Sequence, residues 1–104
     1  MRYQGILPHM VSDRIQAWMR GHFRPEDLEP ALDLLADLVS QEREDAAGTE
    51  RVQAAVVLLS GGDSQRFLEA AALAWQDWRD VLVAAGLAHD DWRDRLNVEL
   101  PYRP

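Results

Sequence analysis

The chain has 104 residues, of which 47% are apolar, and a formal net charge of −7. At this length we expect one domain, residues 1–104, that buries roughly 60–65% of the surface of its unfolded chain. Because the chain has no cysteine and no lysine, it can form no disulfide, thiolate metal site, Walker-type phosphate loop or Schiff base.

The first residues contain only a short apolar patch, far less than a secretion signal needs. We therefore expect a cytoplasmic protein with a flexible N-terminus over residues 1–7. A first helix is predicted over residues 9–23, with Ser12 or Pro8 marking its beginning. Its apolar stripe consists of Met10, Ile15, Trp18, Met19 and His22.

A second helix is predicted after Pro25. Pro30 would disturb its first turns, because proline cannot donate a backbone hydrogen bond and restricts the residue before it. We expect a turn over 25–29 and then the helix proper, whose buried face is Leu28, Ala31, Leu32, Leu35, Leu38 and Val39. Residues 40–48 are charged and lack an apolar period, so a loop is predicted there.

Acidic residues are concentrated in the region from Glu26 to Glu50, which has nine carboxylates and one arginine. Along the second helix, four of them recur at a spacing of three or four residues and lie along one edge. This pattern is typical of a solvated helix face, and it could also dock a basic partner. The candidate partner-binding residues are Glu26, Glu29, Asp33, Asp37 and, from the charged loop, Glu44.

The most apolar segment follows Thr49. Val52, Ala55, Val56 and Leu59 fall on one helix face, and neighbouring alanine, valine and leucine residues cover most of the rest. A helix that is apolar nearly all round must be enclosed by others, and this one is too short to span a bilayer. Thr49 is the expected N-cap, and Gly61 or Gly62 the end.

The sequence therefore predicts an all-α bundle of five to six short helices around a central hairpin, residues 50–60 and 64–76, with Asp63 capping the second helix of the hairpin. The motif Asp-Trp-Arg-Asp at 77–80 recurs at 91–94, and each copy is interpreted as a helix start with aspartate as N-cap. Helices are expected over 64–76, 78–85 and 90–98, and an extended tail over 100–104. Gly86 should end the middle helix in the left-handed conformation, with Leu87 making the accompanying apolar contact.

Four tryptophans in a chain of this length are many. Trp75, Trp78 and Trp92 could form a recognition surface, because tryptophan anchors many interfaces. A domain this small must use its largest apolar side chains for stability, so we predict that they belong to the core. Trp75 is also expected on the buried face of its helix, together with Phe67, Ala71 and Ala74, with Leu68 and Ala72 beside it.

Four segments stand out between residues 49 and 96: Glu-Arg-Val-Gln-Ala-Ala-Val at 50–56, Gly62-Asp63, Arg66-Phe67 and the run Asp77 to Leu87. Over roughly these residues the chain resembles a family of small, uncharacterised all-helical proteins of GC-rich bacteria. The resemblance implies no known activity, so it assigns no role to any residue.

The pattern of reactive residues favours a non-enzymatic role. His9, His22 and His89 lie in separate regions, and none is paired at metal-ligand spacing. No nucleophile elbow is present, and no cofactor or metal site is predicted. The helical hairpin has the turn length of a DNA-binding motif, but a chain with this negative charge would be repelled by phosphates. We expect no direct nucleic-acid binding and no membrane association.

Three functions remain open. The first is a non-enzymatic cytoplasmic domain that binds a protein partner, which could be a second copy of itself. The second is an acidic inhibitor or nucleic-acid mimic that presents region 26–50 to a basic partner. The third is a small ligand-binding protein or enzyme with a pocket between its helices.

Overall fold

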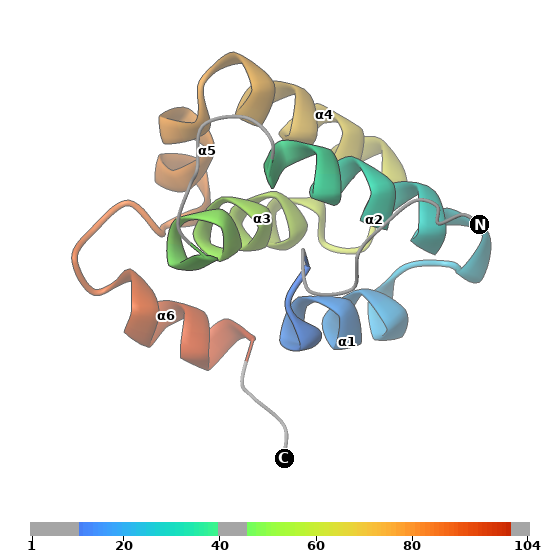
Figure 1. Ribbon diagram of the computed structural model, residues 1–104, viewed down its shortest axis with the longest axis horizontal. Helices are drawn as coiled ribbons and strands as arrows, with labels where there is room; N and C mark the ends of the chain where they lie inside the picture. Colours follow the sequence, from blue (N-terminus) through green and yellow to red (C-terminus); the bar gives the residue numbers. More distant parts are fainter. Residues whose placement is uncertain (1–10, 40–45, 101–104) are drawn as a thin grey trace.

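The computed structural model describes residues 11–39 and 46–100, which form six helices and no strand (Figure 1). This confirms the predicted all-α fold and its central hairpin. The expected flexible segment 1–7, Met10, Glu44 and the tail after Leu100 lie outside the described residues. The helices are α1 (Asp13–His22), α2 (Pro25–Val39), α3 (Ala46–Ser60), α4 (Ser64–Gln76), α5 (Trp78–Ala85) and α6 (Trp92–Glu99).

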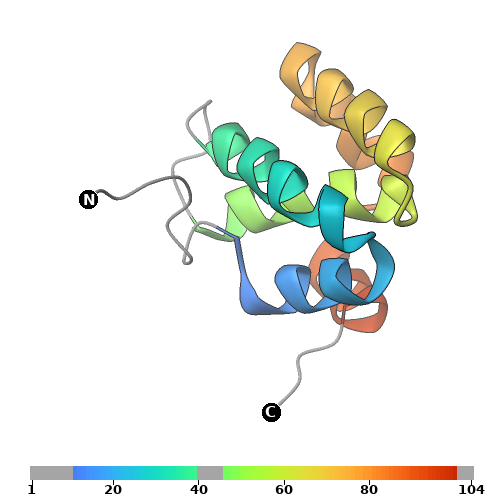
Figure 2. The ribbon, with the colours of Figure 1, turned by 90° about the vertical axis from the view of Figure 1, so that its right-hand side faces the viewer.

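Helix α3 lies at the centre and packs against each of the other five helices. Two views show α2 and α4 on one side of it and α1 and α6 on the opposite side (Figures 1 and 2). Residues 54–57 are fully buried, as expected for a helix that is apolar nearly all round. The polar side chain of Gln53, just before these residues, is 1% exposed and donates a hydrogen bond of 2.9 Å to the Leu35 carbonyl of α2. This bond satisfies the amide and fixes α2 on α3.

The turn between α3 and α4 follows the prediction. Gly61 and Gly62 have φ of 58° and 90°, which glycine adopts at little cost. The Asp63 carboxylate accepts a hydrogen bond of 2.9 Å from the Arg66 amide and caps α4. A Cβ at Gly62 would lie 2.7 Å from the His22 carbonyl oxygen. The turn therefore packs directly on the C-terminal end of α1.

Several predicted boundaries are wrong. Helix α1, predicted over residues 9–23, covers Asp13–His22. Helix α2 begins at Pro25 without a separate turn over 25–29, and it contains Pro30. Proline is well suited to the first helical position, which Pro25 occupies. Pro30 removes only the backbone hydrogen bond to the carbonyl of Glu26, and Glu26 is exposed to water. Helix α3 begins at Ala46, so the predicted loop over 40–48 is wrong from that residue onward and Thr49 does not cap the helix. Ala46 and Ala47 favour helix, which explains the additional turn.

The helix is interrupted at Asp77, between α4 and α5, as predicted. The Asp77 carboxylate accepts a hydrogen bond of 3.0 Å from the Arg79 amide. Gly86 ends α5 with φ of 77°, and the amide of the buried Leu87 bonds the Leu82 carbonyl. This is the expected left-handed cap. The second copy of the motif differs, because Asp91 precedes α6 without a side-chain cap bond, and the helix begins at Trp92. Leu100, predicted to start the extended tail, is 2% exposed and belongs to the core.

The tryptophans divide between core and surface. Trp92 is buried, and Trp78 is partly buried against the core. Trp75 is 48% exposed, so the prediction that it belongs to the core is wrong. The buried face of α4 consists instead of Phe67, Ala70, Ala71 and Ala74. Trp75 and Leu68 lie at the edge of that face, where the described part of the chain provides no covering helix.

Candidate functional site

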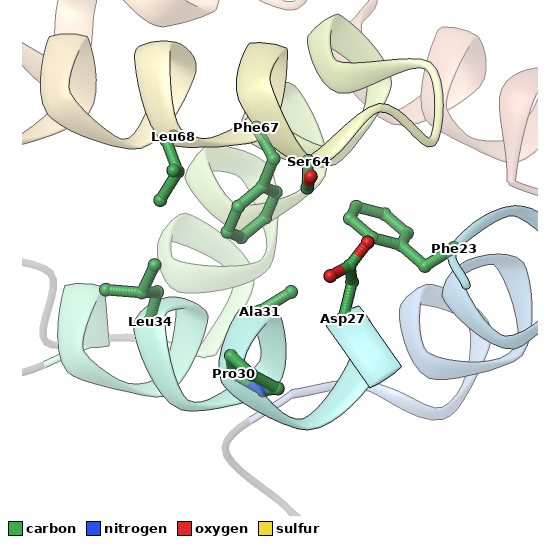
Figure 3. Close-up of a pocket in the computed structure, with 8 residues that line it drawn as sticks. All are labelled: Phe23, Asp27, Pro30, Ala31, Leu34, Ser64, Phe67 and Leu68. Carbon is green, nitrogen blue, oxygen red and sulfur yellow. The ribbon is translucent and has the colours of Figure 1, made fainter. Parts of the chain in front are cut away.

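A cavity of about 190 Å³ opens between α2 and α4 (Figure 3). The two helices run in roughly the same direction, and each presents one edge to the other (Figures 1 and 2). The lining side chains are mostly apolar: Phe23, Asp27, Pro30, Ala31, Leu34, Ser64, Phe67 and Leu68. These eight residues define the α2/α4 groove.

Two phenylalanines form the inner wall of the groove. The rings of Phe23 and Phe67 meet edge to face, with centroids 5.5 Å apart and planes at 88°, and both residues are buried. This geometry is favourable for aromatic pairs, and it holds the end of α1 against α4. Because both rings are packed in the core, the wall of the groove is preformed.

The two ends of the groove differ in chemistry. At one end, Leu34 of α2 and Leu68 of α4 face each other, and at the other the Asp27 carboxylate lies near Ser64 and Phe23 (Figure 3). Within the described residues, Asp27 has no ion-pair partner. An apolar slot with one available carboxylate can accept an apolar side chain and, beside it, a cation.

An apolar stripe continues from the groove along α4. Leu68, Ala72 and Trp75 lie at i, i+4 and i+7, which places them on one helix face. Leu68 is 51% exposed and Trp75 is 48% exposed. The other large exposed apolar side chains of the described residues, Val83 and Val98, stand apart on α5 and α6. On α4, exposed apolar side chains thus adjoin a cavity.

Carboxylates lie along the solvent-facing side of α2, in and beside the helix row of Pro30, which lines the groove. Helix α2 contains five acidic residues and no basic one. Four of them form the acidic edge and are exposed: Glu26, Glu29, Asp33 and Asp37. Glu26 has an ion-pair contact with Arg24 at 3.6 Å, between two well-exposed side chains, and such surface pairs contribute little. Four of the five predicted partner-binding residues are thus together on one helix, and Glu44 lies outside the described residues.

The site predicted from the sequence contained only acidic residues and missed the apolar ones. The sequence pattern assigned Trp75 to the buried face and Leu68 beside it, because apolar spacing identifies a helix face but not the helix that covers it. The i, i+4, i+7 spacing of Leu68, Ala72 and Trp75 was the available signal. Asp27 was counted among the acidic residues, but nothing local distinguished it from the exposed carboxylates.

A second polar cluster lies on the opposite side of α3. The Arg14 side chain is 6% exposed, and its guanidinium donates to both carboxylate oxygens of Glu50, at 2.8 and 3.1 Å. It also donates to the Asn97 side chain at 2.7 Å and to the Leu100 carbonyl at 3.2 Å. Burial by itself would raise the pKa of Glu50, but the hydrogen bonds and charge of Arg14 hold that pKa below its ordinary value of 4.5. The guanidinium is occupied in joining α1, α3 and α6, so we interpret the cluster as structural.

The histidines do not form a site in the described part of the chain. The His22 ring stacks on Trp18 with centroids 3.8 Å apart, and its Nδ1 lies 2.7 Å from the Trp18 carbonyl oxygen. His89 is exposed. Residues 11–39 and 46–100 contain no group of three or more histidine and acidic side chains arranged to hold a metal ion. None of their helices has the length and apolar character needed to cross a membrane.

Comparison with known proteins adds no relative: no protein-family model matches the chain, and neither a curated protein nor a solved structure is significantly similar to it. The resemblance over residues 49–96 therefore stays a prediction. The features of the molecule that bear on its function are the α2/α4 groove and its surroundings.

Proposed function

We propose that this protein is a non-enzymatic, cytoplasmic helical domain that binds another protein through the α2/α4 groove. The observation that supports this most is the half-exposure of Leu68 and Trp75 on one face of α4, beside a cavity walled by Phe67. Contiguous exposed apolar side chains beside a preformed cavity are typical of protein interfaces.

The size of the cavity favours a protein partner over a small ligand. Pockets for drug-sized molecules and cofactors occupy about 300–1,000 Å³, whereas this cavity measures about 190 Å³. A cavity of this size suits a single anchoring side chain, which is how many interfaces concentrate their binding energy.

A capture experiment from source lysate tests the proposal. The variant Leu68→Ser/Trp75→Ser removes the exposed apolar groups, and Val83→Ser/Val98→Ser is the matched control on α5 and α6. We expect the control to capture the same partner as the parent chain and the α4 variant to lose it. Equal capture by both variants would contradict the proposed site. Light scattering on the purified chain reports whether the partner is a second copy.

The acidic edge supports a second candidate, an acidic inhibitor or nucleic-acid mimic that presents its carboxylates to a basic partner. Helix α2 has five carboxylates and no base, and such a helix raises the association rate with a positive surface. The two candidates differ in the role of the apolar stripe. Mimicry requires Asp33 and Asp37 but tolerates Leu68→Ser/Trp75→Ser, whereas groove binding does not.

A further inference from the structure

The shape of the α2/α4 groove and the charge along its border together indicate what occupies it. We propose that the groove takes the apolar face of a basic amphipathic helix from a partner protein. This inference rests on the proposed function and adds the chemistry of the partner. The apolar side chains of the partner helix would contact Leu34, Leu68 and Trp75, and the basic side chains of the same helix would lie over the acidic edge.

The geometry favours a helix as the occupant. A slot between two helices that run side by side accepts a third helix by its apolar face. Glu26 and Asp37, the ends of the acidic edge, are eleven positions apart on α2, which is about 16 Å at the helical rise. Leu68 and Trp75 are seven residues apart on α4, about 10 Å along its axis. A partner helix of about three turns spans both.

Charge determines which helix fits. On α2, Glu26, Asp33 and Asp37 share a helix row with Pro30, which lines the groove, and Glu29 lies one row further toward solvent. Asp27 lies at one end of the cavity. On α4 the only charged side chains are Arg66 and Glu69, which fall outside the line of Ser64, Leu68 and Trp75. The border therefore has a net negative charge that helix α4 does not compensate. Arginine or lysine side chains flanking the apolar face of the partner would complement it.

The same charge disfavours two other occupants. A second copy docked symmetrically would place one acidic edge near another, and like charges at an interface are costly. An anionic lipid surface would meet the same repulsion. Both remain outcomes that the experiment below detects.

Two synthetic peptides of about 15 residues test the inference directly. Both have leucine at i, i+4, i+7 and i+11 in an alanine background, and they differ only in flanking arginine against flanking glutamate. Fluorescence anisotropy of labelled peptide measures Kd with the full chain. We expect the arginine peptide to bind at least about tenfold more tightly, and its advantage to shrink as salt rises.

Variants of the chain locate the binding. Asp33→Arg/Asp37→Arg should weaken binding of the arginine peptide at least about tenfold. The control Asp90→Arg/Glu99→Arg has the same net charge but changes exposed residues around α6, on the other side of α3, and should leave Kd nearly unchanged. Leu68→Ser/Trp75→Ser should also weaken binding of the arginine peptide at least about tenfold. Circular dichroism confirms that each variant is folded.

The inference would be overturned by equal binding of the two peptides, by no binding of either, or by full affinity in the Asp33→Arg/Asp37→Arg variant. If the peptides fail while Leu68→Ser/Trp75→Ser still abolishes capture from lysate, the partner chemistry is wrong and the proposed function stands. If Leu68→Ser/Trp75→Ser instead dissociates a dimer that light scattering detects in the parent chain, the groove is occupied by a second copy of the chain. If capture is unaffected by the variant, the proposed function itself fails.

Discussion

Leu68 and Trp75 lie on the same face of α4, and each keeps about half of its surface exposed in a domain that buries most of its other large apolar side chains. Leaving two such groups in contact with water forgoes stabilisation that burial would provide. We propose that a partner bound at the α2/α4 groove covers both side chains, which would explain their exposure in the free chain.

The contrast between Trp75 and Phe67 gives the first prediction. Phe67 is 2% exposed and packs edge to face on Phe23, so Phe67→Ala should destabilise the fold by about 3–5 kcal/mol. Trp75→Ala should cost about 1 kcal/mol or less, because half of the side chain is already in water. Urea unfolding of the two variants measures both values. Equal losses would mean that Trp75 is a core residue after all.

The pair Arg14 and Glu50 predicts how stability depends on pH. The pKa of Glu50 is lowered in the folded protein, so its contribution is complete above the ordinary value of 4.5 and is lost as pH falls through the folded value. Glu50→Gln should therefore lower stability by about 1–2 kcal/mol at pH 7, since water partly screens the pair. The gap between parent and variant should narrow as pH falls below 4.5.

Thermal melts between pH 7 and pH 3.5 measure that gap. Arg14→Met provides the control, because once the guanidinium is absent Glu50→Gln should no longer destabilise the fold and should instead remove an unpaired, partly buried carboxylate. A gap that stays constant with pH, or that persists in the Arg14→Met background, would show that the ion pair is not its origin.

The two glycines of the α3–α4 turn form a matched pair. Both have positive φ, but a Cβ meets nothing within 4 Å at Gly61, whereas at Gly62 it lies 2.7 Å from the His22 carbonyl oxygen. Gly61→Ala should cost about 1 kcal/mol for the left-handed conformation alone. Gly62→Ala should cost more than about 2 kcal/mol, because the backbone of α1 must also move. Chemical denaturation of each variant tests the difference, and a smaller loss at Gly62 would contradict the close packing of the turn on α1.

The sequence predicts the features that depend on neighbours along the chain. The apolar run from Val52 predicts an enclosed helix, because no face of it can lie in water. Asp63, Asp77 and Gly86 predict their helix ends, because capping is chemistry between residues a few positions apart. The start of α2 was missed because the cost of Pro30 was assigned to a helix interior, whereas it falls close to the exposed first turn.

The features missed from the sequence depend on contacts between distant residues. Arg14 bonds Glu50 and Asn97, which are 36 and 83 positions away, and no local pattern connects them. Trp75 was assigned to the core because its spacing matches a helix face, but only the packed structure shows that α2 leaves it uncovered. The acidic edge was predicted from spacing alone, and its position beside an apolar groove required the fold.

Photo-cross-linking from position 75 tests most directly whether the groove is a binding site. The variant Trp75→p-benzoylphenylalanine keeps an aromatic side chain on the apolar stripe of α4 that continues from the groove, and Val98→p-benzoylphenylalanine places the same group at an exposed position on α6. After irradiation in source lysate, mass spectrometry identifies the cross-linked segment. We expect position 75, and not position 98, to capture one partner through a segment with basic residues and apolar residues at helical spacing. Identical adducts from both positions, or none from position 75, would contradict a binding site between α2 and α4.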